Sequence, residues 1–211
     1  MNSFFILLNY IKMSMITVEE LSKLANECLQ LSDVENSGKN KGERGQKVEN
    51  LLGLSNTNTL TDCIDGDLKT TTIGQTIFIT QLLHVLNEII KDKISFDESK
   101  VGKKIGKCLY LVYDKNKGLL GKFHVTKTKY PIHYSKLSED FDFISNEIRR
   151  IYNEKGTLHT INGPNKLLQI RTKDSKPYNP LNYNEHQLKD KYMAFYLRSS
   201  FAKSLLNNEL C

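Results

Sequence analysis

The amino-acid sequence predicts a mixed α/β (α+β) fold, in which helices and strands alternate along most of the chain. Apolar residues recur at helical spacing near both ends and in the middle of the sequence. In contrast, residues 108–113 form a continuous apolar run, which is typical of a buried central strand. The 211 residues, 39% of them hydrophobic, are enough to bury a core in one domain.

Helical spacing and helix-end residues place the elements of the first half. Helices are expected over residues 17–31 and 43–54. Part of the apolar run 76–90 could be strand and part helix, and helix is favoured from about 80. Thr17 and Glu20, three residues apart, form a capping box at the start of the first helix, and Gly53 is a suitable end for the second. A strand is expected over 68–73, where Gly74 breaks the pattern.

The second half is expected to contain two strands, a helix, a late strand and a final helix. The strands cover residues 108–113, 117–126 and 166–171, and the helices cover 138–152 and 199–208. Phe141, Ile144 and Ile148 lie at helical spacing, which supports the first of these helices. A polar loop with prolines is expected over 172–184.

Composition and charge narrow the classes of function. The net charge of +6 suits a polyanionic partner, although an AT-rich genome would also produce a lysine-rich chain. The four cysteines and five histidines show no metal-ligand spacing, which argues against zinc and disulfides and favours a cytoplasmic, reducing compartment. The apolar N-terminal segment is too short to cross a membrane, so no membrane association is expected. We expect residues 1–15 to be an N-terminal extension and residues 16–211 to form a single domain.

An acidic cluster followed by a lysine is the main chemical signal in the sequence. It reads Thr61-Asp62-Cys63-Ile64-Asp65-Gly66-Asp67-Leu68-Lys69-Thr70. Alternate residues of a strand point the same way, so Asp67 and Lys69 are expected to share a face. Two carboxylates can hold Mg²⁺ beside a phosphodiester, and a lysine on that face can position or activate water. An ordinary solvated turn has the same pattern, so the rest of the chain decides between the two interpretations.

Three stretches together resemble one family of nucleases. The first is Lys41-Gly42-Glu43-Arg44-Gly45-Gln46-Lys47-Val48-Glu49, and the second runs from Asp62 to Asp67-Leu68-Lys69-Thr70. The third comprises Leu168-Gln169-Ile170-Arg171-Thr172-Lys173 and Phe195-Tyr196-Leu197-Arg198-Ser199-Ser200-Phe201. In pattern and order they resemble the MutH-like endonucleases of the PD-(D/E)xK superfamily, which include mismatch-repair MutH and GATC-cutting type II restriction endonucleases.

The resemblance implies a restriction-endonuclease-like core, with a mixed central sheet flanked by helices. It also implies that Asp62 and Asp67 are Mg²⁺ ligands, that Lys69 is the water-orienting base, and that Glu49 is an auxiliary catalytic acid. Asp67 stands where the MutH pattern has glutamate, and the gap between the two acids is shorter. Asp65 could therefore replace Asp62 as the first ligand, although we favour Asp62. From its residues alone, Glu49 could instead be a solvated helix residue.

The same resemblance implies residues that contact DNA. Arg171, Thr172 and Lys173 resemble the base-reading loop of the family, and arginine or lysine to guanine is the commonest specific contact in the major groove. Tyr196 resembles a residue near the DNA, but could also be an aromatic core residue at a strand end. The candidates for contact with the scissile phosphate are Lys103, Lys104 and Lys107. These lysines could equally be a solvated run before a strand.

The sequence therefore predicts Mg²⁺-dependent, sequence-specific cleavage of double-stranded DNA. The resemblance implies cutting on the 5′ side of G in GATC. A type II restriction enzyme would cut both strands as a transient homodimer on a palindromic site, with a companion DNA methyltransferase. We favour this form because Arg198-Ser199-Ser200 looks closer to the restriction branch. The alternatives are a MutH-type repair enzyme that nicks one strand and a non-catalytic DNA-binding module.

Overall fold

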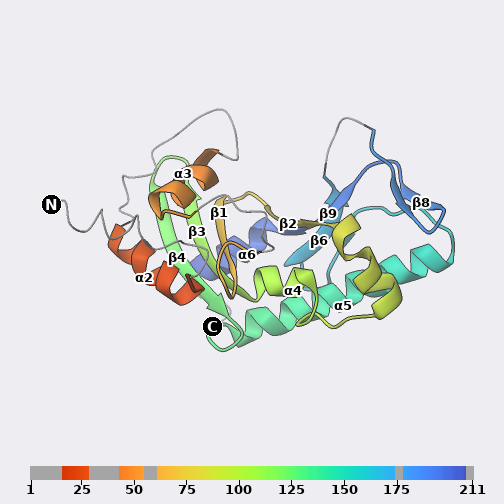
Figure 1. Cartoon of the computed structure of the whole chain (residues 1–211), viewed down its shortest axis with the longest axis horizontal. Coiled ribbons are helices and arrows are strands. Elements are labelled where there is room, and N and C mark those ends of the chain that lie inside the picture. Colours follow the sequence, from red (N-terminus) through yellow and green to blue (C-terminus); the bar gives the residue numbers. More distant parts are fainter. Residues whose placement is uncertain (1–15, 29–42, 55–60, 174–177, 208–211) are drawn as a thin grey trace. The chain divides into compact units, whose positions relative to one another are not determined.

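The structure is a computed structural model that describes residues 16–28, 43–54, 61–173 and 178–207. The expected N-terminal extension, residues 29–31 of the first predicted helix and residues 174–177 of the predicted loop lie outside these residues. The mixed α/β class is confirmed (Figure 1). Within the described residues the strands form three separate sheets, of three, four and two strands. None of the described helices is long and apolar enough to cross a membrane.

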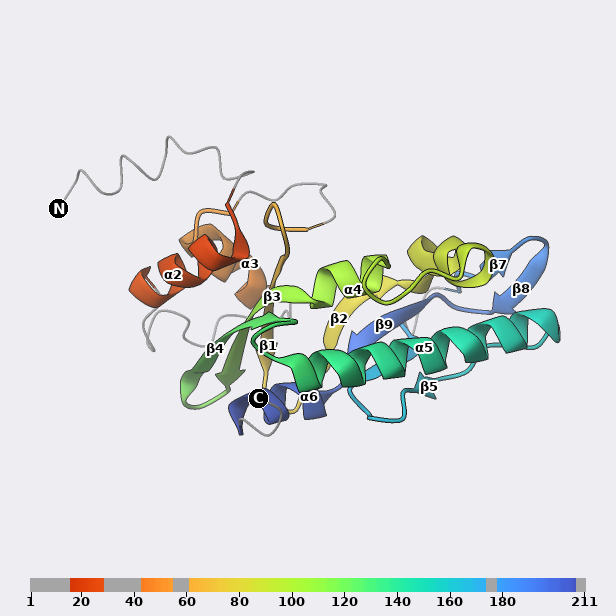
Figure 2. The ribbon, with the colours of Figure 1, turned by 90° about the horizontal axis from the view of Figure 1, so that it is seen from below.

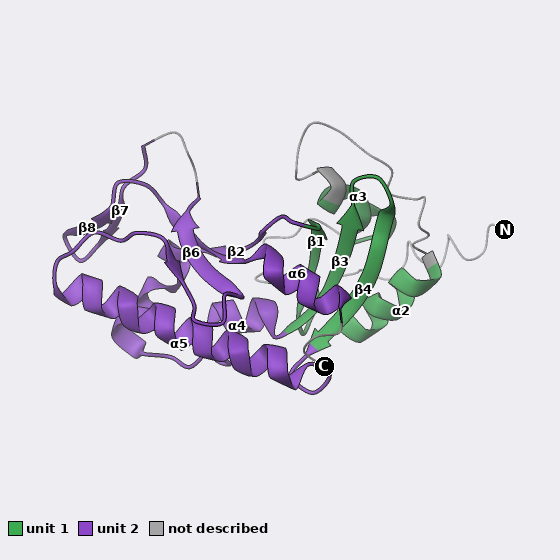
Figure 3. Cartoon of the chain, turned by 180° about the vertical axis from the view of Figure 1, so that it is seen from behind, with its two compact units in different colours: residues 1–73, 107–125 green, residues 74–106, 126–211 purple. Residues whose placement is uncertain are grey.

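The chain divides into two compact units, each built from two separate stretches of sequence (Figure 3). Unit 1 comprises residues 1–73 and 107–125, and unit 2 comprises residues 74–106 and 126–211. The acidic cluster therefore belongs to unit 1, whereas the residues expected to contact bases belong to unit 2. The single domain expected over residues 16–211 stays a prediction.

Unit 1 is a three-stranded sheet with two helices packed on one of its faces (Figure 1). Its elements are α2 (Val18–Cys28), α3 (Glu43–Leu51), β1 (Asp67–Thr72), β3 (Lys107–Asp114) and β4 (Gly118–Thr126). The strand β1 pairs in parallel with β3, so that Leu68 lies opposite Leu109 and Asp67 opposite Cys108. The apolar core between sheet and helices includes Val18, Leu21, Val48, Leu52, Leu68, Leu109 and Leu111. Because side chains alternate along β1, Asp67 and Lys69 lie on the face opposite this core.

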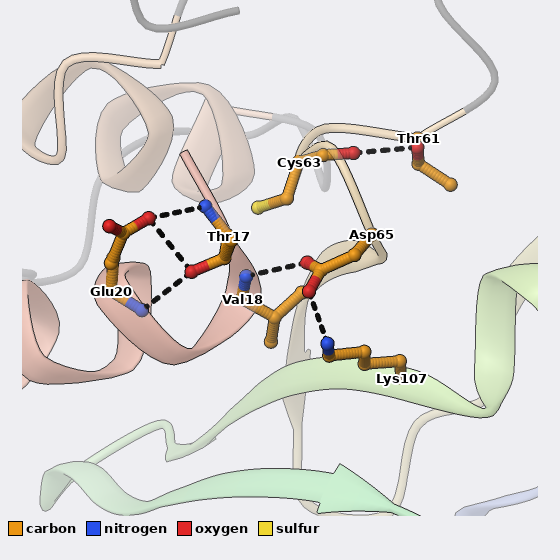
Figure 4. A network of polar contacts seen from close by, with 7 residues as sticks. All are labelled: Thr17, Val18, Glu20, Thr61, Cys63, Asp65 and Lys107. Carbon is orange, nitrogen blue, oxygen red and sulfur yellow. Dashed lines mark hydrogen bonds and ion pairs between the residues drawn. The ribbon is translucent and has the colours of Figure 1, made fainter. Parts of the chain in front are cut away.

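The capping box predicted at the start of α2 and the glycine predicted at the end of α3 are confirmed. The backbone N–H and the hydroxyl of Thr17 each donate to the Glu20 carboxylate at 2.8 Å, and the Glu20 N–H donates back to Thr17 Oγ1 (Figure 4). This reciprocal capping box begins α2. At the end of α3, Gly53 has a φ of +68°, a conformation that glycine adopts without strain.

Unit 2 is built on a four-stranded sheet in the order β2-β9-β6-β5. The strands of this sheet are β2 (Ile77–Gln81), β5 (Ile161–Asn162), β6 (Leu168–Thr172) and β9 (Met193–Leu197). The helices of the unit are α4 (Lys100–Ile105), α5 (Pro131–Asn153) and α6 (Ser199–Leu206). A separate hairpin consists of β7 (Leu181–Tyr183) and β8 (His186–Lys189). The long helix α5 runs alongside the sheet and packs on β5 and β6 (Figure 2). Strand β9 pairs antiparallel with both β2 and β6, which sets the side chains of these three strands in cross-strand rows.

The buried carboxylate of Asp140 holds the start of β6 to helix α5. It accepts hydrogen bonds from the backbone N–H groups of Asn165, Leu167 and Leu168 at 2.7, 2.8 and 2.8 Å. Gly163 lies so close that an added Cβ would be 2.1 Å from Asp140 Cγ. The buried Asp140 side chain of α5 therefore fixes the position of β6, the strand that carries Arg171.

Several elements of unit 2 differ from the sequence prediction. Strand β7 lies inside the predicted loop 172–184, and β5 and β8 were not expected. Residues 80–90 do not form a regular α-helix: the chain leaves β2 through a 3₁₀ turn (Leu82–Val85) and a π-helical turn (Glu88–Asp92). The short helix α4 was not expected, although Ser99 caps it by accepting from the Gly102 N–H at 2.9 Å. Strand β9 was also not expected, because five apolar residues do not distinguish a strand from a helix by their period.

Candidate metal site and nucleic-acid interface

The acidic cluster forms a tight turn directly before β1, which we call the acid turn (residues 61–67). The Cys63 N–H donates to Gly66 O at 2.9 Å and closes the turn. Gly66 packs so tightly that an added Cβ would lie 2.0 Å from Lys107 O. The turn therefore brings its two flanking acids, Asp62 and Asp67, next to each other.

Asp62 and Asp67 contact each other through their backbones and carboxyl groups. The Asp62 N–H donates to Asp67 Oδ1 at 3.3 Å, and the Leu68 N–H donates to Asp62 Oδ2 at 3.1 Å. Asp67 is 1% exposed, whereas the Asp62 residue as a whole is exposed. Desolvation of the carboxyl, and next its hydrogen bond and charge repulsion with Asp67, raise the pKa of Asp62 to about 7.

Lys69 lies against this pair of acids, on the face of β1 that the sequence predicted. Its Nζ forms an ion pair with Asp67 Oδ2 and donates to Leu68 O at 3.3 Å. Desolvation alone would lower the pKa of Lys69, but the neighbouring Asp67, Cys108 and Asp62 outweigh it and raise the pKa. The Lys69 side chain is therefore a cation that donates hydrogen bonds.

Asp65, the other candidate for the first acid, has different partners (Figure 4). Its Oδ1 accepts from the Val18 N–H at 2.9 Å, and its Oδ2 forms an ion pair with Lys107 Nζ. Desolvation would raise the pKa of Asp65, but Lys107 and the Val18 N–H together lower it. The structure thus places Asp62, and not Asp65, in contact with Asp67. Lys107, one of the candidates for phosphate contact, instead forms an ion pair with Asp65 of the turn.

Glu49 lies on α3, half-buried, on the side of the sheet that bears the apolar core. A Cβ added at the neighbouring Gly45 would lie 3.4 Å from Thr70 Oγ1 and 4.0 Å from Glu49 Oε1. Thr70 alternates with Lys69 along β1 and so points to the opposite face. In the part of the chain that the structure describes, no group of three or more His, Cys, Asp or Glu side chains could hold a metal ion. The structure therefore does not bring Glu49 together with the two acids.

The donor set of the acid turn fits Mg²⁺. This ion takes hard oxygen ligands, keeps several of its waters and needs only one or two carboxylates from a protein. Asp62 and Asp67 supply two carboxylates side by side, with the Leu68 N–H on Asp62 Oδ2 and Lys69 on Asp67 Oδ2. We regard these two aspartates as the candidate metal ligands of unit 1.

In unit 2, two basic residues lie over aromatic rings on one face of the sheet. The guanidinium carbon of Arg171 is 4.5 Å from the centre of the Tyr196 ring, and Lys173 Nζ is 5.8 Å from the centre of the Phe78 ring. The two rings meet edge to face at 5.7 Å. Arg171 also donates to Thr76 Oγ1 at 2.9 Å, which fixes its orientation.

Cross-strand register explains why these residues meet. Tyr196 on β9 lies opposite Phe78 on β2 and opposite Gln169 on β6. Arg171 follows Gln169 by two residues and therefore shares its face. We call this surface the basic–aromatic face (Phe78, Gln169, Arg171, Lys173 and Tyr196). Cations and an exposed aromatic ring on one surface suit nucleic acid, because cations attract phosphates and an exposed ring can stack on a base. Phe78 is 42% exposed, whereas Tyr196 is buried beneath Arg171.

Phe78 is a candidate functional residue that sequence reasoning missed. It is 42% exposed, whereas its neighbours Ile77 and Ile79 are buried. The sequence showed an apolar run here, and such a run hides which residue of a strand points outward. The alternation Ile77-Phe78-Ile79 was the available signal, once residues 77–81 are read as a strand.

The remaining predicted DNA contacts are less organised. Thr172 is half-buried and points to the face opposite Arg171. Lys103 is exposed and Lys104 half-exposed in the last turn of α4, and neither side chain is paired with another described residue. These two lysines are therefore available to a polyanion, but nothing in their surroundings orients them.

Comparison with known proteins does not assign the chain to a family, because its sequence matches no protein-family model and no curated protein. The resemblance of the three motifs to MutH-like endonucleases therefore stays a prediction.

Proposed function

We propose that this protein is a Mg²⁺-dependent, sequence-specific endonuclease of double-stranded DNA, of the type II restriction class. The observation that carries the proposal is the acid turn, in which two aspartate carboxyl groups and a lysine ammonium meet at the start of β1. Keeping two acids together on an ordinary surface would be unfavourable, and such arrangements are enriched at functional sites.

The chemistry follows from the roles of three side chains. Asp62 and Asp67 would hold the metal, and a bound Mg²⁺ would polarise the phosphodiester and activate the attacking water. Lys69, held as a cation by Asp67, would orient that water and stabilise negative charge on the phosphate. The water oxygen forms a bond to phosphorus as the P–O3′ bond breaks. The attacking water would release a proton to solvent and the 3′ oxygen would take one up from solvent, which leaves 5′-phosphate and 3′-hydroxyl ends.

The basic–aromatic face supports DNA as the substrate. This face contains two cations, Arg171 and Lys173, and both are exposed. Arginine and lysine side chains read guanine in the major groove. Together with the motif resemblance, this favours a guanine-containing site, and GATC is the site that we propose.

A non-catalytic DNA-binding module is the second candidate. The position of Glu49, away from Asp62 and Asp67, favours it, because the expected third acid is not beside the pair. In that case the ion pair between Lys69 and Asp67 would only stabilise the turn. A third form, a repair enzyme that nicks one strand, would use the same three residues and differ in its products.

Digestion of unmethylated plasmid DNA with Mg²⁺, followed by sequencing of the cut ends, tests the proposal. We expect linear products with ends 5′ of G in GATC, protection by adenine methylation, and no cutting in EDTA. Nicked circles would favour the repair form. Binding without cutting, in wild-type protein and in Asp67→Asn alike, would favour the non-catalytic module. The half-exposed acid Asp114, at the end of β3, supplies the control Asp114→Asn.

The expected partners are tested separately. A companion DNA methyltransferase would be encoded beside this protein and would protect the same sequence. A transient homodimer would appear in sedimentation experiments with a palindromic duplex and be absent without DNA.

A further inference from the structure

We propose that Asp65 is a positioning residue for the metal site, which it serves by anchoring the acid turn rather than by binding metal. This inference rests on the proposed function, because it concerns the same pair of aspartates. It assigns a role to an acid that the sequence pattern offered only as an alternative ligand.

The acid turn is anchored on two sides through Asp65. One carboxylate oxygen accepts from the Val18 N–H, in the first turn of α2, and the other pairs with Lys107, the first residue of β3 (Figure 4). A backbone hydrogen bond from the Ile64 N–H to Ile16 O, at 3.0 Å, supports the same side of the turn. Both oxygens of Asp65 are thus engaged within unit 1.

The position of the turn determines how the two ligands meet. Asp62 precedes the turn and Asp67 follows it, so their separation depends on how the intervening residues are held. Lys107 precedes Cys108, which is the register partner of Asp67. The ion pair therefore joins the tip of the turn to β3 at the point where Asp67 is itself fixed. Ile64, beside Asp65, is 57% exposed and provides little packing of its own.

Removing this anchor should weaken metal binding without removing a ligand. Residues that orient the ligands of a metal typically contribute about 10- to 100-fold to metal affinity. Asp65→Ala loses both contacts, and we expect its dissociation constant for Mn²⁺ to rise about tenfold. Asp65→Asn keeps an oxygen for the Val18 N–H and should show a smaller rise. Lys107→Ala removes only the ion pair and should resemble Asp65→Asn.

Mn²⁺ binding, followed by electron paramagnetic resonance of the free ion, measures the effect without any need for cleavage. Thermal unfolding of the metal-free variants shows whether each still folds. Asp114→Ala is the matched control, since Asp114 also accepts backbone N–H groups in a turn, at the other end of β3. The double variant Asp65→Ala/Lys107→Ala should bind Mn²⁺ about as weakly as Asp65→Ala alone, because the two side chains act through one contact.

The outcomes separate three roles for Asp65. Unchanged Mn²⁺ affinity in Asp65→Ala, alongside binding by the wild-type protein, would overturn the inference and leave the proposed function standing. Loss of Mn²⁺ binding in Asp65→Asn with normal binding in Lys107→Ala would make Asp65 a ligand, and would also overturn it. Wild-type protein that neither binds Mn²⁺ nor cuts DNA would overturn the proposed function itself. If Asp65→Ala fails to fold, Asp65→Asn and Lys107→Ala decide the question.

Discussion

The acid turn of unit 1 and the basic–aromatic face of unit 2 are built in opposite ways. The acids of the acid turn and the lysine beside them, Lys69, all come from one stretch of sequence, residues 61–69. The basic–aromatic face takes its side chains from β2, from β6 with the residue after it, and from β9, which strand pairing alone brings together. A short motif can therefore encode the chemistry of this chain, whereas the surface that would read its substrate depends on the tertiary fold.

The two regions also hold charge of opposite sign in different ways. In the acid turn, Lys69 pairs with Asp67, and desolvation together with the neighbouring Asp67 raises the pKa of Asp62 to about 7. On the basic–aromatic face, Arg171 and Lys173 lie over aromatic rings instead of acids. A cation over a ring keeps its charge available to a phosphate, while a carboxylate partner would compete with it.

The largest expected effect separates cutting from binding. Asp62→Ala, Asp67→Ala and Lys69→Ala should each reduce Mg²⁺-dependent cleavage to background, because each removes a metal ligand or the cation beside it. Affinity for duplex DNA in Ca²⁺ should stay close to that of the wild type, since the base-reading side chains belong to unit 2. Plasmid digestion and binding isotherms measure the two properties. Cleavage at the wild-type rate by Asp67→Ala would contradict the assignment of unit 1.

A second change should act on unit 2 through stability. Asp140→Ala leaves three backbone N–H groups without their charged partner at a buried site. We expect a loss of about 3 kcal/mol or more in the free energy of unfolding, measured with denaturant. DNA affinity should fall as well, because β6 carries Arg171. Asp142→Ala, an acid on the same helix, is the control, and an equal loss of stability there would contradict this role of Asp140.

The sequence predicted the local features well. The capping box of Thr17 and Glu20, the helix end at Gly53 and the shared face of Asp67 and Lys69 are all confirmed. Each depends on residues at most three or four positions apart, whose geometry a helix or strand fixes by itself. The mixed α/β class is confirmed for the same reason, since most elements could be placed from their period.

Features that depend on distant residues were not predictable. Asp65 is held by Val18 and Lys107, which are 47 and 42 residues away. Phe78 faces outward because β2 is a strand with Tyr196 beside it, and strand β9 itself was missed. The position of Glu49 relative to the two acids likewise depends on how α3 packs against β1. The period and spacing of residues along the sequence do not predict such long-range contacts.

A third change tests whether the basic–aromatic face reads bases. Lys173→Ala should lower the affinity for a GATC-containing duplex more than for a scrambled one, with a difference of about 1–3 kcal/mol. The reason is that a lost base contact costs affinity only where the base is present. Binding isotherms on both duplexes at two salt concentrations measure this difference.

Lys103→Ala and Lys104→Ala provide the comparison for that experiment. Lys103 is exposed and Lys104 half-exposed, and no described residue orients either side chain, so they should act as phosphate contacts. Each should weaken both duplexes about equally and reduce the salt dependence by about one unit of slope. Equal losses on the two duplexes for Lys173→Ala would place it in the same group and remove base reading from this face.

The smallest expected effect concerns Phe78 and shows whether its ring contributes more than apolar area. Phe78→Leu keeps an apolar side chain but removes the ring under Lys173 and the edge contact with Tyr196. A cation over an exposed ring contributes about 0.5–1 kcal/mol, so DNA affinity should fall about two- to fivefold. Thermal stability should hardly change, because Phe78 is 42% exposed. Phe78→Tyr keeps the ring and should bind like the wild type; a loss as large as that of Phe78→Leu would mean that shape, and not the ring face, sets the position of Lys173.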